Sequence, residues 1–148
     1  MRWPKTFELS RFLVEVAGVD SVQIDKGFAG RRAYYHDSCA GLRELGIKTE
    51  PRTLLVRAGI DIVEGEGAET CCGFGGLFSV KFPDISGAIV DKKIEDIQKG
   101  TTDLILGGDL GCLMNIQGRL SRLGLDIEVR HFAEILAGAT TPAIGRRR

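Results

Sequence analysis

Residues 103–124, with the sequence DLILGGDLGCLMNIQGRLSRLG, contain a short apolar run, a glycine-rich turn and an amphipathic repeat. The apolar run at residues 103–106 predicts a buried strand. After the turn, apolar side chains recur at intervals of three and four, which predicts a helix closed by Gly124. These side chains are Leu113, Ile116, Leu120 and Leu123. The segment is therefore expected to be one strand–helix unit of an α/β fold.

The same alternation continues on both sides of this unit. Short apolar runs predict further strands at residues 33–36, 60–63 and 127–129. Helices are expected at residues 6–18 with Thr6 as the cap, around Cys39 to Leu45, from Pro51 to Gly59, from Pro83 to Gly100, and at residues 132–136. Together these elements predict a three-layer αβα fold with a small, mainly parallel sheet of about four strands.

Length and composition limit the classes of protein to which the chain can belong. Its 148 residues fit one domain whose core needs no disulfides. We expect an N-terminal helix and linker over residues 1–30, the main domain over 31–138 and a tail over 139–148. Lys plus Arg equals Asp plus Glu at 20 each, which argues against nucleic-acid binding. No apolar stretch approaches the roughly 18 residues of a membrane span and no signal-peptide pattern is present, so a cytoplasmic, reducing location is expected.

The cysteines are expected to converge at one end of the sheet. Cys39 follows the first predicted strand, Cys71 and Cys72 follow the second, and Asp109 and Cys112 follow the third. In a parallel sheet these positions lie beyond the carboxyl ends of the strands, where α/β folds bind ligands. Helix N-termini at two of the positions would favour thiolate over thiol. In a reducing compartment, such cysteines indicate metal ligands rather than disulfides.

Three glycines directly after the cysteine pair indicate a special backbone conformation. Gly73, Gly75 and Gly76 fail the dinucleotide-binding pattern, which would need glycine where Phe78 stands. They instead predict a tight turn with positive φ angles that brings backbone N–H groups close to the sulfurs of a cluster. We therefore assign these glycines to the binding of a cofactor.

Three segments in this order resemble a known family. The segments are Tyr35-His36-Asp37-Ser38-Cys39, then Cys71-Cys72-Gly73-Phe74-Gly75-Gly76 with Phe78-Ser79-Val80-Lys81, and then Asp109-Leu110-Gly111-Cys112-Leu113. They resemble the cysteine-rich CCG domain of the heterodisulfide reductase B-type subunit, the glycolate oxidase iron-sulfur subunit and the lactate-utilisation iron-sulfur protein, and the last of these looks closest. The resemblance runs from about residue 7 to residue 136. It implies an iron-sulfur cluster of the 4Fe-4S type, electron transfer in a complex that oxidises lactate or glycolate or resembles heterodisulfide reductase, and other redox subunits as partners.

Departures from the family pattern leave several roles open. The heterodisulfide reductase pattern ends in Cys-x-x-Cys, but Asp109 occupies the first of these positions, and this chain carries one motif where relatives usually carry two. Asp109 is a helix cap, which we favour, or a metal ligand. His36 is a fifth ligand, a donor to a cluster sulfur or a structural histidine with partners of its own, and we favour the last two. His131 is expected to be structural.

Two functions remain open from the sequence. The first is an iron-sulfur electron-transfer domain, with no catalytic residue assigned and enzyme activity of its own left uncertain, because the chain offers no flavin or nicotinamide site. The second is a zinc-bearing structural or interaction domain, since four cysteines also suit tetrahedral zinc. The cationic residues that could ease the charge of a cluster are Arg43, Lys81, Lys92 and Lys93, and we expect them on solvated faces.

Overall fold

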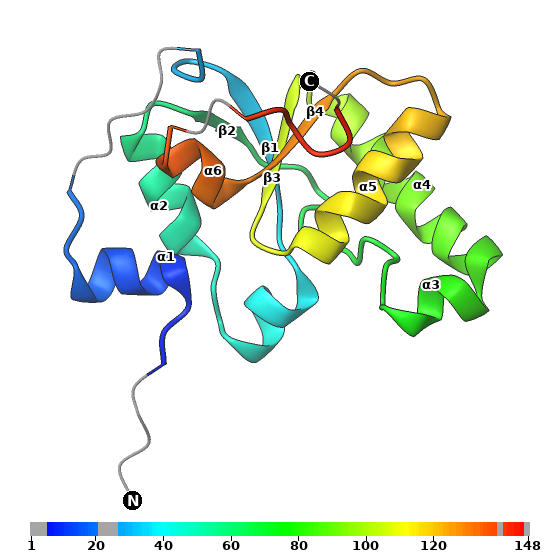
Figure 1. The fold of residues 1–148 in the computed structure, drawn as a ribbon, viewed down its shortest axis with the longest axis horizontal. Coiled ribbons are helices and arrows are strands. Elements are labelled where there is room, and N and C mark those ends of the chain that lie inside the picture. Colours follow the sequence, from blue (N-terminus) through cyan, green and yellow to red (C-terminus); the bar gives the residue numbers. More distant parts are fainter. Residues whose placement is uncertain (1–5, 21–26, 139–140, 147–148) are drawn as a thin grey trace, which may run out of the picture.

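The computed structural model describes residues 6–20, 27–138 and 141–146. Within them, one parallel sheet has the strand order β2-β1-β3-β4. The strands are β1 (Arg32–His36), β2 (Asp61–Val63), β3 (Leu104–Gly107) and β4 (Glu128–His131). Helices cover both faces of this sheet (Figure 1). The predicted three-layer αβα fold with a small parallel sheet of about four strands is confirmed.

The helices alternate with the strands along the chain, as predicted. Helices α2 (Thr49–Arg57) and α6 (Phe132–Leu136) cover one face of the sheet, and α4 (Pro83–Lys99) and α5 (Leu110–Arg122) cover the other (Figure 1). The shorter elements are α1 (Leu9–Arg11), the π-helical turns η1 (Phe12–Val16) and η2 (Ala40–Glu44), and α3 (Leu77–Lys81). Helix α4 matches the prediction from Pro83 to Gly100, because Pro83 is its first residue and Gly100 its C-cap.

Alternating side chains of the strands divide the core into two halves. Tyr34 and Ile105 are fully buried against α4 and α5, whereas Ala33 and Leu104 are fully buried against α2 and α6. This is the two-residue periodicity of a strand, whose successive side chains point to opposite faces. Because both faces are covered, β3 is a continuous apolar run rather than an alternating one.

Two local predictions are wrong, and one short helix was not predicted. Glu8 rather than Thr6 caps the first helix, because its carboxylate accepts hydrogen bonds from the backbone N–H groups of Ser10 at 2.8 Å and Arg11 at 3.1 Å. Pro51 is the third residue of α2 and not its first, since the helix begins at Thr49. The first-turn position is still tolerated, because N–H groups there have no partner within the helix. Helix α3 was not predicted, since its five residues are too few to show a periodic pattern.

The strand order places a topological switch point between β1 and β3. The chain passes from β1 to β2 on one side and then crosses to β3 on the other side. His36 at the end of β1 pairs with Gly107 at the end of β3, so the loops that follow these strands diverge from neighbouring positions. Such a crevice is where open α/β sheets bind ligands. None of the helices in the described residues is long and apolar enough to cross a membrane.

Candidate metal centre

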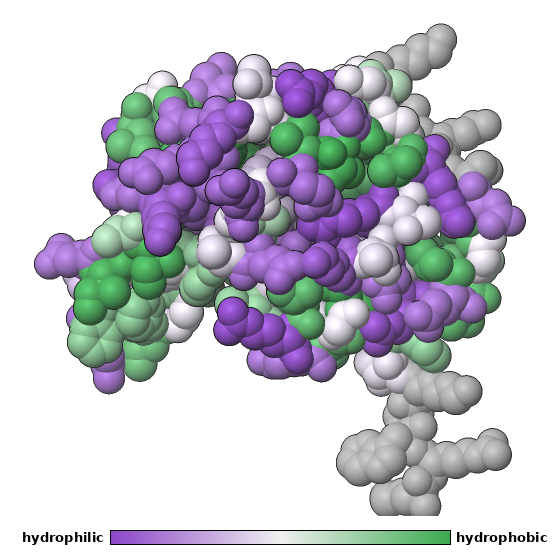
Figure 2. Space-filling model, turned by 180° about the vertical axis from the view of Figure 1, so that it is seen from behind, coloured by the Kyte–Doolittle hydropathy of each residue, from purple (hydrophilic) through white to green (hydrophobic). Residues whose placement is uncertain are grey.

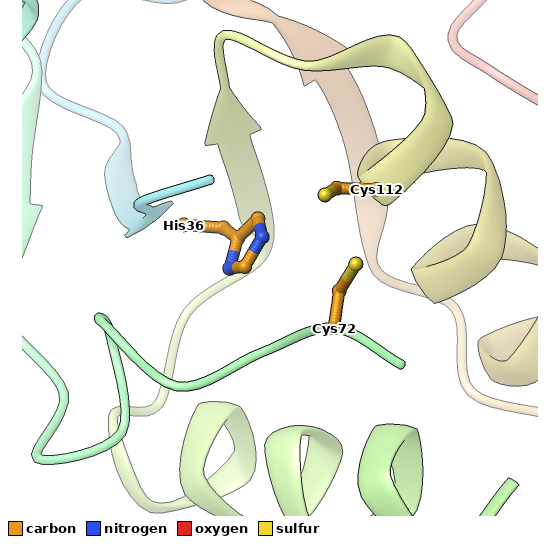
Figure 3. Close-up of side chains that lie close together, drawn as sticks. All are labelled: His36, Cys72 and Cys112. Carbon is orange, nitrogen blue, oxygen red and sulfur yellow. The ribbon is translucent and has the colours of Figure 1, made fainter. Parts of the chain in front are cut away.

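Side chains from three separate loops meet at the switch point. His36 ends β1, Cys72 lies in the loop after β2, and Cys112 lies in the first turn of α5 after β3. One ligand atom from each of these residues lies within 4.8 Å of the other two. Figure 3 shows the two sulfurs and the imidazole ring pointing toward a common point. Of the residues predicted to converge at the strand ends, Cys72 and Cys112 therefore meet, and His36 joins them.

Asp109 fixes the start of the helix that carries Cys112. It is the N-cap of α5, and its Oδ1 accepts a hydrogen bond of 2.9 Å from the backbone N–H of Cys112. The predicted capping role is thus confirmed, whereas a role as a ligand stays a prediction. Through this contact the side chain of Asp109 sets the orientation of the first turn, and with it the position of the Cys112 sulfur.

The turn after the cysteine pair has the conformation that its glycines predicted. Gly73, Gly75 and Gly76 have φ angles of +83°, +52° and +59°. The backbone N–H of Gly73 donates to the Cys71 sulfur over 3.3 Å. The backbone N–H of Phe74 points at the Cys72 sulfur and favours its thiolate form. The turn therefore directs N–H dipoles at both sulfurs, an arrangement that suits anionic groups.

Two helices hold this turn in place. The Ser86 hydroxyl of α4 donates to the Gly73 carbonyl at 2.8 Å, and the Asn115 side chain of α5 donates to the Cys72 carbonyl at 2.9 Å. A Cβ atom at Gly73 would lie only 2.6 Å from the Ser86 carbonyl oxygen. Glycine is therefore required there both by its positive φ and by the close approach of α4.

The loop with Cys39 is fixed in a similar way. Arg52 of α2 donates to both carboxylate oxygens of Asp37, at 2.8 and 2.7 Å. The Ser38 hydroxyl accepts a hydrogen bond of 3.0 Å from the N–H of Gly41, as expected of a helix cap. Cys39 itself is the N-cap of η2. A bidentate pair with arginine and a capping contact therefore fix the backbone on either side of this thiol.

Cys39 lies beside the exposed Cys71 rather than in the His36 cluster. Burial raises the pKa of the Cys39 thiol, and so do the negative charge of Cys71 and a hydrogen bond with it. Cys72 contributes in the same direction, so it is also near. The four cysteines therefore share one end of the sheet as two neighbouring groups, and ligation of a metal by all of them stays a prediction.

A hydrogen bond between Cys72 and Cys112 shifts the pKa values of the two thiols in opposite directions. A hydrogen bond from Cys112 lowers the pKa of the Cys72 thiol to about 4, with further help from His36 and in opposition to burial. The same hydrogen bond, together with burial, raises the pKa of Cys112. The two thiols therefore titrate as a coupled pair, and their hydrogen bond favours loss of one proton from the pair. A deprotonated sulfur is what a metal ligand requires.

The buried imidazole ring of His36 lies beside the Cys72 sulfur but makes no hydrogen bond of good geometry within the described part of the chain. It is 1% exposed, and neither Nδ1 nor Nε2 has a hydrogen-bond partner among the described residues. The described structure therefore gives the ring no nitrogen or oxygen partner of its own, and the roles of metal ligand and donor to a cluster sulfur stay predictions. A buried polar group without a partner costs free energy, which a metal or a cluster sulfur near the ring would recover. Imidazole nitrogen and thiolate sulfur are donors that soft and borderline metals prefer, so these residues fit such a metal.

Other predicted and unpredicted residues complete the site. His131 lies outside the cluster as a structural residue, because it caps α6 and its Nδ1 accepts a hydrogen bond of 3.2 Å from the N–H of Ala133. The sequence analysis missed Ser86 and Asn115, which support the loop with the cysteine pair. Asn115 lies three positions after Cys112 on the same helix, and this spacing could have indicated a shared face.

Comparison with known proteins supports the same interpretation of the site. Residues 33–117 match the CCG family model, described as a cysteine-rich domain. The chain belongs to the cysteine-rich CCG-domain family. The match covers all four cysteines of this CCG domain, and the predicted resemblance is confirmed.

Proteins similar to this CCG domain include several lactate utilization proteins. This chain is 46% identical over 133 residues to lactate utilization protein A of Oceanobacillus iheyensis, and the match covers 89% of this chain and 53% of that protein. The lactate utilization protein A of Geobacillus kaustophilus is 47% identical, and that of Geobacillus thermodenitrificans is 48% identical, each over 89% of this chain and 54% of the relative. The chain thus spans about half the length of these curated relatives.

Proposed function

We propose that this CCG domain holds an iron-sulfur cluster, of the 4Fe-4S type, and passes electrons within a complex that oxidises a 2-hydroxy acid such as lactate. The observation that carries the proposal is the convergence of His36, Cys72 and Cys112 at the switch point, with Cys39 and Cys71 beside them. The names of the similar proteins favour lactate over glycolate. A reducing, cytoplasmic location is part of the proposal, because cluster thiols must stay unoxidised.

The residues of the chain would prepare the site for an anionic group. The four cysteines would supply thiolates, the N–H groups of Gly73 and Phe74 would donate to sulfur, and His36 would bind the metal or donate to a cluster sulfur. An iron-sulfur cluster supplies one-electron chemistry, with a potential set by hydrogen bonds to sulfur and by exposure to solvent. Oxidation of the hydroxy acid would belong to another subunit with its own cofactor.

A zinc site is the second candidate, and one observation favours it. The ligand atoms of His36, Cys72 and Cys112 lie within 4.8 Å of one another, a spacing compatible with tetrahedral zinc at bond lengths of about 2.3 Å to sulfur and about 2.0 Å to nitrogen. Cys39 or Cys71 would supply a fourth ligand. Such a site would give the domain a structural or interaction role and no electron-transfer function.

An apolar surface beside the cysteine pair supports docking of another redox subunit. The side chains on α3 and at the start of α4 are unusually exposed: Leu77 63%, Val80 75%, Phe82 51% and Ile85 54%. We call these four residues the α3 surface. Figure 2 shows apolar side chains gathered over this part of the molecule, at the lower left. Large exposed apolar patches commonly mark protein interfaces, and this one directly follows the loop that carries Cys71 and Cys72.

Metal analysis after anaerobic purification tests the proposed function. We expect iron and acid-labile sulfide in equal amounts, a brown protein with absorption near about 400 nm, and bleaching on reduction, as sulfur-to-iron charge transfer requires. Stoichiometric zinc in a colourless protein would replace the first proposal by the second. A domain that takes up neither metal after anaerobic reconstitution would refute both.

A pair of valine variants tests the docking part separately. Val80→Asp places a charge in the α3 surface, whereas Val56→Asp places the same charge on α2, where Val56 is also exposed at 59%. We expect Val80→Asp to slow electron exchange with the lactate-oxidising subunit and Val56→Asp to leave it unchanged, with equal iron content in both. Equal rates for the two variants would exclude the α3 surface as the docking site.

A further inference from the structure

Lys93 is a buried cation next to the candidate metal centre. It lies on α4 and is 1% exposed, although the sequence pattern placed it on a solvated face. Its Nζ donates to the carbonyl oxygens of Gly67 and, at 3.1 Å, Ala68. It also lies 5.7 Å from the centroid of the Tyr34 ring. Among the described residues, no carboxylate lies within the 4.0 Å of an ion pair with Lys93.

The two carbonyls held by Lys93 belong to the loop that leads to the cysteine pair. The Ala68 carbonyl also accepts a hydrogen bond of 3.1 Å from the backbone N–H of Asp37, just after β1. One carbonyl therefore joins α4, the loop with Cys71 and Cys72, and the loop with Cys39. The ammonium group of Lys93 thus connects the segments that carry three of the cysteines.

Asp96, a buried carboxylate three positions after Lys93 on α4, already has other partners. Its Oδ2 accepts from the Tyr34 hydroxyl at 2.9 Å and from the backbone N–H of Gly67 at 2.9 Å. Lys93 and Asp96 thus hold the same loop from one helix, the first through carbonyl groups and the second through an N–H group. No direct ion pair forms between Lys93 and this carboxylate, although its charge still acts on the ammonium group.

The charge of Lys93 is therefore only partly compensated in the protein alone. Burial lowers the pKa of its ammonium group to about 8, while the negative groups that oppose this shift are Asp96, Cys72, Asp37 and Cys71. Two of the four are thiols of the candidate metal centre. A buried cation without an ion pair costs free energy, and a nearby anionic centre would recover part of that cost.

We infer that Lys93 is the buried counter-cation of the metal–thiolate centre and the clamp that positions the loop with its cysteine pair. The inference rests on the proposed function, because it requires that the cysteines hold a metal. The hydrogen bonds of Lys93 in the described part of the chain go to the loop and not to a cysteine, so we treat it as a positioning residue. Reduction adds negative charge to a cluster, so a nearby cation stabilises the reduced form more than the oxidised form. Removal of the charge is therefore expected to lower the reduction potential.

The test compares Lys93→Met with Lys92→Met in the anaerobically purified protein. Lys92 is the neighbouring residue on α4 and is exposed, so its replacement removes the same formal charge without touching the clamp. For Lys93→Met we expect the preference for the reduced cluster to fall about tenfold, which for one electron is about 59 mV to more negative potential. For Lys92→Met we expect little change, since solvent and salt screen an exposed charge.

A third variant separates the charge from the clamp. Lys93→Gln keeps a neutral donor for the carbonyls of Gly67 and Ala68, so we expect it to retain the fold by circular dichroism and still to show the lowered potential. Equal reduction potentials in the Lys93 variants and in Lys92→Met would overturn the proposal that Lys93 is the counter-cation. Failure of both Lys93 variants to fold would also overturn it, since a structural role alone would then be left.

The wild-type protein distinguishes failure of this inference from failure of the proposed function. If the wild type holds iron and the reduction potentials of Lys93→Met and Lys92→Met do not differ, only the proposed role of Lys93 is refuted. If the wild type holds zinc, electron transfer is lost as a function, and the same variants are compared by competition with a chelator. We then expect Lys93→Met to release zinc at about tenfold lower chelator concentration than Lys92→Met, and equal release would overturn the counter-cation.

Discussion

Replacement of Asp109 separates helix capping from metal ligation. In the structure this carboxylate makes one capping contact, the hydrogen bond of 2.9 Å from the N–H of Cys112 to Oδ1. Asp109→Ala removes that acceptor and should lower the free energy of unfolding by about 1 kcal/mol, the usual cost of a lost N-cap. For a domain of this size, such a loss lowers the melting temperature by about 3 °C. Asp109→Asn should cost much less, because asparagine caps about as well as aspartate.

The metal content of the same variants gives the deciding result. If Asp109 only caps α5, Asp109→Asn retains the wild-type amount of iron or zinc per chain after anaerobic purification. The thermal melts of the metal-free proteins are compared in parallel, so that a loss of fold is not mistaken for a loss of ligand. Loss of metal in Asp109→Asn, with helicity and melting temperature unchanged, would refute the interpretation that Asp109 acts only as a cap and would make the carboxylate a ligand.

Four further predictions follow from the structure. Gly73→Ala should destabilise the protein by about 1–2 kcal/mol from its positive φ alone, more with the clash against α4, and lower the metal content. Gly118→Ala, in the interior of α5 with no atom within 4 Å of the added Cβ, should instead stabilise it by up to about 1 kcal/mol in thermal melts. Cys112→Ser should lower metal occupancy sharply without unfolding the apo form, since a soft donor is lost; full occupancy by elemental analysis would exclude this sulfur as a ligand. Glu128 should make the apo protein less stable in acid. Burial raises the pKa of this carboxyl group, but hydrogen bonds from Arg31 and Arg130 lower it by more. The contribution of Glu128 to the free energy of unfolding is therefore present above the unfolded-state pKa of about 4.3 and is lost as the pH falls through the folded-state pKa. Denaturation with urea between about pH 6 and pH 3 should show a weaker pH dependence for Glu128→Gln, and an unchanged dependence would contradict this reasoning.

The sequence predicted the fold because its local patterns agree with the tertiary structure. The apolar run before Asp109 forms the buried strand β3, and the apolar face of the helical repeat after it is buried in α5. Asp109 between them caps the helix, as aspartate often does. The first helix was harder to predict. Thr6 and Glu8 can both cap, and only the position at which the chain begins to coil decides between them.

The details of the site depend on contacts that no local pattern carries. Lys93 is buried because the irregular loop at Gly67 and Ala68 covers it, and a loop without periodicity gives no sign of where it will pack. The lack of partners for His36 likewise follows from the arrangement of three loops. Sequence reasoning could place the cysteines at one end of the sheet, since that requires only the strand order, but it could not divide them into two neighbouring groups.

The switch-point position of the site also determines when it can form during folding. The site and the loop that supports it are held by contacts between distant parts of the chain: the hydrogen bond from Asn115 to Cys72 spans 43 positions and that from Tyr34 to Asp96 spans 62. Such long-range contacts form late, because the entropy of loop closure must first be overcome. A nascent chain that has not yet docked β3 and α5 has only a partial set of thiols. Binding of a metal by the complete site would therefore occur only after the sheet has formed.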